Sequence, residues 1–600
     1  MKKVLLTTPV GPYDTQSYNQ SLTDAMDQRF SRGCGIFTMR GHIHINFAHV
    51  LAQNIQAPSV FLEYPLREDF DNELAKGYDI LGINGFHNQR DVVIEMCHRA
   101  RKLAPDTRII LGGWSGVAIK SMFPEWEWRK YADDICVGEG IRYMRQQLGE
   151  DPLAPVSVTH LPKCSAMLPW IERHPIGDMG TVVASLGCPN GCDFCGTTHM
   201  FSGKRLRLLS PQQTFEEMKR YFRDNPLLMW VNLIEEDSFA DTNFMRELGE
   251  LIQQDTEYGL ERLNFFCLAS NQSLSRWDFD DILKTGVMTI FIGVESMFAP
   301  DAGYKKRTGR SIEETFSELH RRGIATIGAW ILGFDFQNRD NVTEDLESFI
   351  ALEPTMQQLT RLCPFPGTPL WQQVADEGRI DPKNVPIDSI SFFGGGGMKP
   401  KGFYEHEIMD IIERGYVKLY ETWGSVLLRQ FKIFLNGYEY CKDHRDPLVR
   451  KRAVFHRNMA VELYPLIYAQ EVYAPNTTVR KRVRDELARY KHLLGEPSKA
   501  QRIMERLVVK RARQAIRDEI ETPINLYPKE EPYKRYEYHR RNKPGESPYT
   551  VTHPRRELSY RLHDLKRRAR MAVLRPVLQM LSGGTGEEAK RQQFTAKRVM

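Results

Sequence analysis

The sequence predicts a multidomain α/β protein. It comprises a doubly wound, five-stranded parallel sheet of Rossmann-like type, a partial (β/α)6 barrel of TIM type and a mainly helical C-terminal region. Short apolar runs alternate with helical patterns over residues 1–145 and again over 179–380. Strands separated by helices imply parallel sheets with crossover connections. Residues 400–520 show helical patterns without such runs, and 600 residues exceed what one core can bury.

The first module, residues 1–145, carries glycines where its predicted strands end. Parallel sheets bind ligands at the carboxyl ends of their strands, and glycine lets a flat, bulky ligand approach the backbone closely. We therefore expect a ligand at this edge. The five predicted strands are KKVLLTT, VFLEYP, DILGING, RIILGGW and DICVGEG.

A proline-rich linker is predicted over residues 146–178, before the barrel begins. An open, partial barrel would bind its ligands at the carboxyl ends of six strands. These strands are TVVASLG, LMWVNLIEED, NFFCLAS, MTIFIGVES, ATIGAWILGF and QQLTRLCPF.

The C-terminal tail, residues 521–600, reads as an extended segment that ends in an amphipathic helix over about 555–575. The last 100 residues hold 24 Lys and Arg against 12 Asp and Glu. A basic amphipathic helix can lie on an anionic membrane surface or bind a partner, and it can equally pack on its own domain. The tail contains no known nucleic-acid-binding motif, so no specific nucleic-acid partner is expected.

The composition is that of a soluble globular protein, with 41% hydrophobic and 26% charged residues. No apolar run approaches the ~20 residues needed to span a bilayer. The ten cysteines are not spaced as a disulfide framework. We therefore expect a cytoplasmic protein, with peripheral membrane contact as an option through the basic tail.

Three cysteines follow the first barrel strand closely, in the stretch SLGCPNGCDFC. Cys188, Cys192 and Cys195 are soft ligands suited to zinc or to an iron–sulfur cluster. Structural zinc would require a fourth ligand, for instance His199 or Cys164. A cubane cluster held by three thiolates instead keeps one iron free for another molecule.

The pattern CPNGCDFC resembles the signature of the radical S-adenosylmethionine (SAM) superfamily. The resemblance implies that Cys188, Cys192 and Cys195 hold a [4Fe–4S] cluster whose fourth iron is chelated by SAM. Reductive cleavage of SAM then gives a 5′-deoxyadenosyl radical, which abstracts hydrogen from the substrate. Phe194 would lie against the adenine.

Later strands carry further motifs of the superfamily in the expected order. IEEDSF resembles the acidic motif after the second strand, which places Glu235, Glu236 and Asp237 near the SAM amino group, although each can instead cap the following helix. IGVES resembles the fourth-strand motif, in which Glu295 would bind the ribose hydroxyls. Ser270, at the end of the third strand, is a weaker ribose candidate.

Two other segments extend this resemblance along the barrel. YKKRTGRS is similar to the basic segment whose cation pairs with the SAM carboxylate. Arg307 is the candidate for this cation, and Lys306 is the alternative. A run of solvated charges without a ligand is the interpretation that assigns it no function. GAWILGF is similar to the fifth-strand motif that faces adenine, and LCPFPGTPLW to the sixth-strand ending.

A parallel module placed before such a barrel resembles the cobalamin-binding-domain radical SAM class. The DxHxxG motif that ligates cobalt in other cobalamin proteins is missing after the first strand, so the module can also be a scaffold without cofactor. His42 and His44 precede the first predicted helix and could reach a ligand. Glycines that could contact a corrin through the backbone, or serve only as turns, are Gly112, Gly113, Gly116, Gly138 and Gly140.

The resemblance implies a cobalamin-dependent methyltransferase that acts on an unactivated carbon of a small-molecule or lipid substrate. It also implies a one-electron reductant such as flavodoxin or ferredoxin. No catalytic residue is assigned beyond the cluster. Alternatives are radical cyclisation or rearrangement without methyl transfer and, more remotely, a non-catalytic zinc-binding protein.

Overall fold

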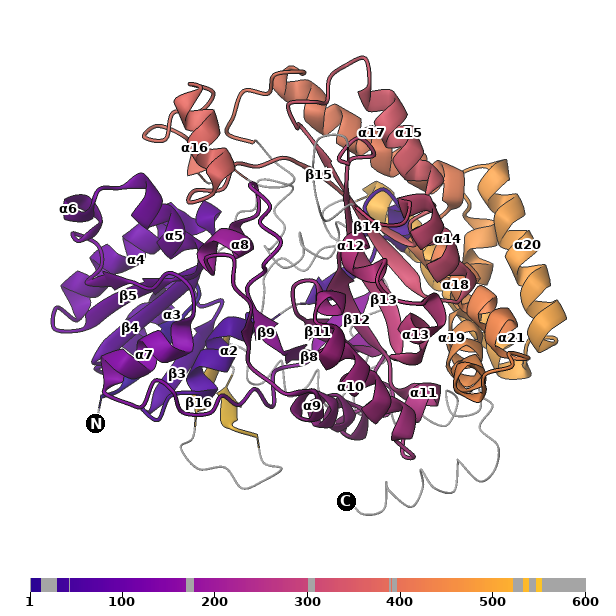
Figure 1. The fold of residues 1–600 in the computed structure, drawn as a ribbon, viewed down its shortest axis with the longest axis horizontal. Helices are drawn as coiled ribbons and strands as arrows, with labels where there is room; N and C mark the ends of the chain where they lie inside the picture. The colour runs from indigo at the N-terminus through magenta and orange to yellow at the C-terminus, as the bar shows by residue number, and fades with distance from the viewer. Residues whose placement is uncertain are drawn as a thin grey trace.

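The computed structural model has the three predicted parts side by side (Figure 1). The N-terminal module, the barrel and the helical region follow one another across the molecule, and α8 (Gly196–Met200) lies at the boundary between the first two. The structure describes residues 2–11, 30–42, 44–168, 177–300, 308–387, 390, 396–521, 533–538 and 547–552.

Some expectations fall on residues outside these ranges. They are the contact assigned to Arg307, with its alternative Lys306, and the basic helix over about 555–575.

The N-terminal module is the predicted doubly wound sheet. Its five parallel strands lie in the order β3-β1-β4-β5-β6. Successive residues of β1 face opposite layers, so that Leu5 packs with α3, α4 and α5 while Val4 and Leu6 pack with α2 and α7. The strands are β1 (Val4–Thr7), β3 (Ser59–Glu63), β4 (Ile80–Gly85), β5 (Arg108–Gly112) and β6 (Asp134–Ile135).

Helices cover both faces of this sheet. α7 begins at a conventional cap, because the Glu139 carboxylate accepts the amides of Ile141 and Arg142. The helices are α2 (Asn46–Gln53), α3 (Arg67–Leu74), α4 (Arg90–Leu103), α5 (Gly113–Met122), the short α6 (Glu125–Trp128) and α7 (Gly140–Leu148), with 3-10 turns η1 (Gly35–Phe37) and η2 (His87–Gln89).

Two strands from the C-terminal tail extend the same sheet, which the sequence analysis did not predict. β16 (Lys534–Tyr538) pairs antiparallel with β3, and β17 (Tyr549–Thr552) pairs with β16. Figure 1 shows β16, in yellow, beside the indigo strands. Part of the tail is therefore the edge of the first module, because residues 534, 536 and 538 bury their side chains against it.

A buried polar cluster joins this tail strand to the module. The Glu63 carboxylate accepts hydrogen bonds from His44 Nδ1 (2.8 Å) and the Tyr536 hydroxyl (3.0 Å), and His49 Nδ1 lies 2.5 Å from the Tyr538 hydroxyl. His44, His49 and Glu63 lie close enough together to bind a metal ion. Lys534, however, already supplies a buried positive charge beside them.

The barrel contains the six predicted parallel strands, in the order β8-β11-β12-β13-β14-β15. Two short antiparallel strands, β7 (Cys164–Met167) and β2 (Arg40–His42), extend the sheet beyond β8. β7 lies within the segment predicted as linker, and β2 comes from the N-terminal module. The parallel strands are β8 (Asp178–Val183), β11 (Trp230–Ile234), β12 (Phe265–Ala269), β13 (Val287–Glu295), β14 (Ala325–Leu332) and β15 (Met356–Arg361).

Amphipathic helices cover the outside of the barrel. α9 begins with a capping box at Ser210 and Gln213 and buries Phe215, Met218 and Phe222. The helices are α9 (Pro211–Asp224), α10 (Thr242–Gln254), α11 (Gly259–Arg262), α12 (Asn271–Leu274), α13 (Phe279–Lys284), α14 (Ile312–Arg321), α15 (Val342–Ala351) and α16 (Pro369–Asp376), with the 3-10 turn η4 (Ser238–Ala240).

The helical region packs against the barrel through α18 and α19, as the predicted change from strands to helices implies. Buried Arg452 on α19 donates to the carbonyls of Leu260, Leu263 and Val287 at the amino ends of the barrel strands. None of the described helices has the length and hydropathy of a membrane span. The helices are α17 (Glu405–Trp423), α18 (Val426–Cys441), α19 (Pro447–Val472), α20 (Thr477–Leu494) and α21 (Lys499–Glu521).

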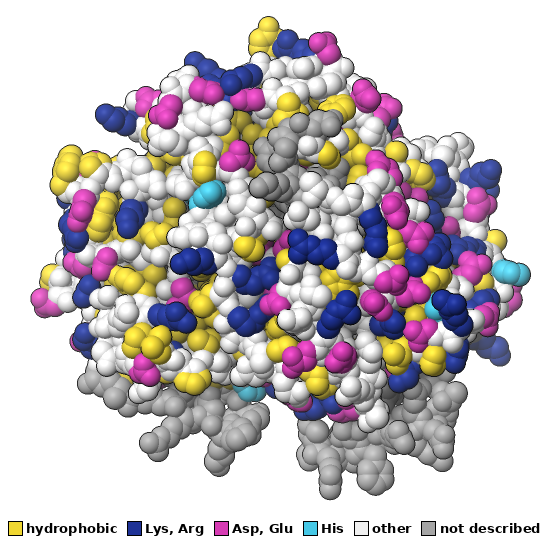
Figure 2. Space-filling view, in the orientation of Figure 1, with side chains coloured by type: hydrophobic (Ala, Val, Ile, Leu, Met, Phe, Trp, Pro, Cys, Tyr) yellow, Lys and Arg dark blue, Asp and Glu magenta, His cyan; other side chains and the backbone are white. Residues whose placement is uncertain are grey.

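Charged residues of both signs are interspersed over the face shown in Figure 2. The charged side chains of the described residues therefore do not form one positive field on that face.

Replacing Glu63 with Gln should destabilise the N-terminal module. Burial alone would raise the pKa of Glu63, but His44 and Lys534 hold that pKa well below its ordinary value. The stabilisation is therefore present above about pH 4.5 and is lost as the pH falls through the lower folded-state value. We expect Glu63→Gln to lower the free energy of unfolding by about 3 kcal/mol at pH 7 and to weaken the acid dependence, as measured by thermal and urea denaturation.

Glu537→Gln is the matched control, because Glu537 lies on the same strand with its side chain largely exposed. It should change stability little. Equal effects of the two substitutions would contradict the role assigned to the buried cluster.

Candidate active site

The three cysteines lie on a loop at the carboxyl end of β8, the edge at which barrel chemistry takes place. The loop is closed at its base by antiparallel pairing of β9 (Ser185–Leu186) with β10 (Leu206–Arg207). The short helix α8 (Gly196–Met200) begins directly after Cys195. The strand pair and the helix therefore fix both ends of the cysteine-bearing segment.

Backbone geometry explains the residue before the first cysteine. Gly187 has φ +80°, and a Cβ there would lie 2.2 Å from the carbonyl oxygen of Lys204. Within the loop, the Cys195 amide donates to the carbonyl of Cys192 (3.1 Å). This tight path leaves no room for a side chain at residue 187.

Cys188 is buried, whereas Cys192 and Cys195 are half-buried. Burial raises the pKa of the Cys188 thiol to about 11, and Glu236 acts in the same direction. A thiolate at this position therefore needs a cation beside it, which is the environment that a metal centre supplies.

The two residues considered as a fourth zinc ligand are engaged elsewhere. His199 Nε2 donates to the carbonyl of Cys192 (3.1 Å), so that nitrogen is protonated and cannot ligate. Cys164 lies in strand β7, and its Sγ is 3.6 Å from the Thr181 hydroxyl of β8. The donor set thus fits a cluster held by three thiolates better than a closed tetrahedral zinc site.

The three acids after β11 have different environments, although the sequence analysis treated them alike. Glu235 is buried and forms a two-pronged ion pair with Arg207 (2.7 and 2.9 Å). Burial raises the pKa of Glu235, and the arginine counteracts that shift. This carboxylate is occupied by Arg207 rather than directed to a SAM amino group.

Asp237 connects the cysteine loop to the next strand end. Its carboxylate accepts from the Asn190 amide (2.9 Å), the Ser270 backbone amide (2.9 Å) and the Ser273 hydroxyl (2.5 Å). The Ser270 hydroxyl accepts a hydrogen bond from the Ser273 amide and so caps α12, which explains a serine at this position without a ligand. Glu236, the third acid of this segment, is half-buried.

Glu295 has a strained backbone at the end of β13. It has φ +59° and is buried, and the pairing of β13 with β14 shifts register between Gly293 and Glu295. Such strain in a non-glycine residue persists only where the surroundings enforce it, and it concentrates at functional sites. The bulge gives this carboxylate a direction that a regular strand would not.

A buried network that the sequence analysis missed supports this bulge. The Asp345 carboxylate accepts from the Ser296 hydroxyl (2.7 Å) and from the Gln337 side chain (2.8 Å). The side-chain oxygen of Gln337 in turn accepts hydrogen bonds from the backbone amides of Gly333 and Phe334. The ends of β13 and β14 are therefore tied together, and no spacing in the sequence signals the contact.

Phe194 lies at the side of the barrel where the fifth-strand motif ends. Its ring is 5.6 Å from that of Phe334, edge to face, and Phe334 stacks on Phe336 at 5.1 Å. The start of α16 joins the same group, because the Leu370 amide donates to the Asp193 carbonyl (3.2 Å). These apolar surroundings suit the position expected for adenine.

On the module side, the predicted glycines fall into two groups. A Cβ at Gly112 or Gly140 would meet no atom within 4 Å, so both leave open space at the carboxyl edge of the sheet. Gly113 and Gly138 have positive φ, and Gly116 packs on Leu111 and Ile135. Backbone conformation or packing therefore explains the glycines at positions 113, 138 and 116, and no ligand is needed to account for them.

The two histidines are not placed as the sequence analysis suggested. His42 belongs to strand β2 at the edge of the barrel sheet and not to the start of a helix. His44 is buried against Glu63, so its Nδ1 is not directed to a ligand.

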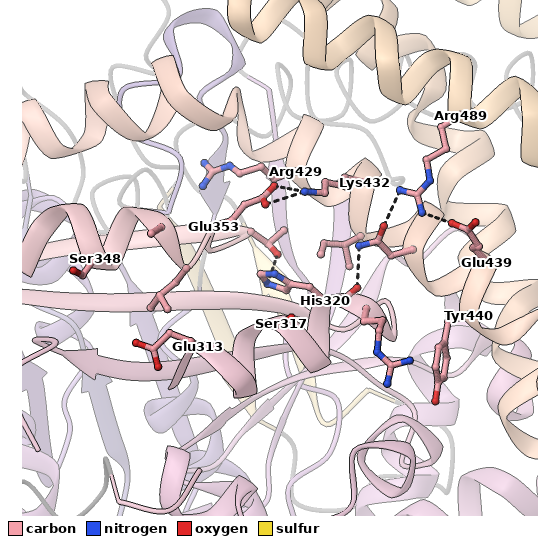
Figure 3. A pocket seen from close by; sticks show the side chains of 16 residues that line it. Glu313, Ser317, His320, Ser348, Glu353, Arg429, Lys432, Glu439, Tyr440 and Arg489 are labelled. Carbon is pink, nitrogen blue, oxygen red and sulfur yellow. Dashed lines mark hydrogen bonds and ion pairs between the residues drawn. The ribbon is translucent and has the colours of Figure 1, made fainter. Parts of the chain in front are cut away.

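A pocket of about 880 Å³ lies at the other end of the barrel, between α14, α15 and α18 (Figure 3). Burial lowers the pKa of His320 on its wall to about 3, so the ring is neutral at neutral pH. Lys432 pairs with Glu353, and Arg489 pairs with Glu439. Thr355, which lines this pocket, directly precedes β15 and so lies at the amino end of that strand. The cysteine loop lies at the carboxyl ends of the strands, so the pocket does not belong to the cysteine site.

Comparison with known families confirms the resemblance read from CPNGCDFC. Residues 182–349 match the radical SAM superfamily. This barrel is therefore a radical SAM domain, a type that uses a [4Fe–4S] cluster and SAM.

The relatives carry two kinds of name, methyltransferase and cyclase. An anaerobic magnesium-protoporphyrin IX monomethyl ester cyclase of Cereibacter sphaeroides is 21% identical to the chain over 241 residues (39% of this chain, 37% of that protein). The chain is 24% identical over 249 residues to an uncharacterized methyltransferase of Pyrococcus horikoshii (40% of this chain, 51% of that protein). It is 24% identical over 335 residues to the hopanoid C-2 methylase of Rhodopseudomonas palustris (50% of this chain, 58% of that protein). The chain thus spans just over half the length of the latter two relatives.

A solved structure also resembles the chain. It is the radical S-adenosylmethionine methyltransferase TsrM from Kitasatospora setae with cobalamin and a [4Fe–4S] cluster bound. The identity is 14% and the TM-score 0.44, over 63% of this chain and 75% of that one.

Substitutions of the neighbouring acids should have different effects. We expect Glu236→Gln to weaken SAM binding about tenfold, the size of one charged hydrogen bond. Glu235→Gln removes the anionic partner of Arg207 and should lower the thermal midpoint while leaving SAM affinity nearly unchanged. Anaerobic calorimetric titration of the reconstituted protein with SAM measures the first effect, and thermal denaturation the second. Equal loss of SAM affinity in both variants would refute the division.

Proposed function

We propose that this chain, whose barrel is a radical SAM domain, is a cobalamin-dependent radical SAM methyltransferase acting on an unactivated carbon. The observation that carries the radical part is the three-cysteine loop, in which His199 Nε2 and Cys164 Sγ, two candidate fourth donors, make other contacts. Bound together, the cluster, SAM and cobalamin would supply a substrate-derived radical and a methyl group to join it.

In this proposal the chain's own residues hold the cluster and SAM and exclude water from the site. Cys188, Cys192 and Cys195 hold the cluster, and Phe194 provides an apolar wall for adenine. Glu236 is assigned to the SAM amino group and Glu295 to the ribose hydroxyls, as the motif resemblance implies. A radical must be kept from water, and the apolar side chains of Phe334 and Phe336 beside Phe194 serve that exclusion.

Cobalamin is assigned to the carboxyl edge of the N-terminal sheet. Gly112 and Gly140 leave open space there. The same edge faces the cysteine loop, since a Cβ at Gly138 would lie 3.3 Å from the carbonyl of Met200 in α8. The names of three curated relatives, among them the hopanoid C-2 methylase, support methyl transfer, whereas one relative is named as a cyclase.

The substrate is proposed to be a small molecule or lipid, and the electron donor a protein such as flavodoxin or ferredoxin. The protein is proposed to be cytoplasmic. Contact with a membrane surface is proposed for the basic C-terminal helix, whose residues lie outside those the structure describes.

Anaerobic reconstitution tests the radical SAM assignment. The parent protein should show the broad absorbance of a [4Fe–4S] cluster and about four irons per chain, the content of one cubane. Cys188→Ala, Cys192→Ala and Cys195→Ala combined should abolish both. A variant with Cys441→Ala, which changes a buried cysteine of α18 outside the barrel, serves as the control. Zinc without iron or sulfide in the parent would favour a structural metal protein instead.

SAM labelled in its methyl group separates methyl transfer from its rival. A methyltransferase places the label in the product, whereas cyclisation or rearrangement leaves the product unlabelled and still forms 5′-deoxyadenosine. Co-purification of a corrinoid from anaerobic expression provides the second readout. Unlabelled product together with a corrinoid-free protein would overturn the methyltransferase assignment and leave the radical chemistry in place.

A further inference from the structure

We infer that Trp114 is a positioning residue that fixes the ligand-binding edge of the N-terminal sheet against the three-cysteine loop. Trp114 stands at the start of α5, directly after the glycines that end β5. The inference rests on the proposed function only where it concerns the corrinoid; the contact itself is independent of it.

The contact is made through the residue after the last cysteine. A Cβ at Gly196 would lie 1.9 Å from Cζ3 and 2.3 Å from Cη2 of Trp114. The six-membered ring of the indole therefore occupies the space that any larger residue at position 196 would need. Because Gly196 begins α8 and Cys195 is its N-cap, the ring touches the backbone that carries a cluster ligand.

Neighbouring contacts bring the loop after β15 into the same junction. The Trp114 ring is 6.4 Å from Phe365, and Phe365 is 4.4 Å from His87 at the end of β4. His87 Nε2 donates to the carbonyl of Ile390 (2.8 Å). A Cβ at Gly367 would lie 2.8 Å from Val117, one turn along α5 from Trp114. The module and the barrel are thus interlocked around the indole.

A rigid aromatic residue suits this role. Its ring has only two rotatable bonds, so it fixes a separation at low entropic cost. Radical and group-transfer reactions depend on reacting atoms held to within about an ångström. Trp114 sits where a small change in side-chain volume alters the distance between a cofactor on the sheet edge and a cluster on the loop.

The contact is tested first without any corrinoid, by a double-mutant cycle. Gly196→Ala should lower iron and sulfide content several-fold after reconstitution, because its methyl group collides with the indole. Trp114→Ala combined with Gly196→Ala should restore most of that content. Trp126→Ala, on α6 of the same module with a side chain 66% exposed, should change nothing. Additive effects of the two substitutions would overturn the inference.

The positioning role is tested next, in protein loaded with cob(II)alamin and a reduced cluster. Pulsed electron paramagnetic resonance reports the magnetic coupling between the two centres. We expect Trp114→Ala to weaken and broaden this coupling at full occupancy of both centres, and Trp114→Phe to recover much of it. An unchanged coupling in Trp114→Ala would overturn the role. Failure of the parent to bind a corrinoid would defeat the proposed function, while a non-additive cycle would still establish the contact.

Discussion

Under the proposed function, the three-cysteine loop must present its sulfurs to a metal centre without completing the metal's coordination, and the rest of the site depends on this constraint. A loop that leaves one coordination position open cannot be fixed by a fourth ligand of its own. Its rigidity therefore comes from neighbouring strand ends. Asp237 binds Asn190, the Leu370 amide binds Asp193, and Trp114 packs on Gly196. Three separate parts of the chain thus hold one short segment.

Polar residues at the carboxyl ends of the barrel strands have two kinds of role: some stabilise the protein backbone, and others are assigned to bind the ligand. Asp237 and Glu295 both adopt positive φ, a costly conformation for residues with side chains. Asp237 uses that geometry to reach three donors within the protein. Glu295 uses it at a bulge that the Asp345 and Gln337 network holds in place, which leaves its carboxylate facing a different direction from the strand. Two similar distortions therefore serve different purposes.

Most of the fold follows from short apolar runs, because each parallel strand is buried on both faces. All five strands of the module and all six of the barrel were predicted in this way. β16 was not, because KRYEY lies in a proline-rich, charged stretch and pairs with residues more than 450 positions earlier. The side chains of residues 534, 536 and 538 are its buried face, an alternation too brief to distinguish from a linker. β2 and β7 were missed for a similar reason, since they span only three and four residues.

The site shows the same limit. Spacing identified the cysteines and the acidic segment, but it could not separate Glu235 from Glu236. What separates them is Arg207, which arrives from β10 on the far side of the cysteine loop. Local sequence describes what a side chain is, whereas its role here depends on which distant charge the fold brings to it.

One edge of the first sheet is supplied by residues close to the end of the described part of the chain, and this matters during protein synthesis. β3 leaves the ribosome early, whereas its partner β16 ends at Tyr538. At about 5–20 residues per second, the interval is roughly half a minute to a minute and a half. Throughout that time the nascent module presents an unpaired strand and an uncovered Glu63, the kind of edge that invites association with other chains. Its completion must therefore come after translation of the catalytic barrel, and not before it.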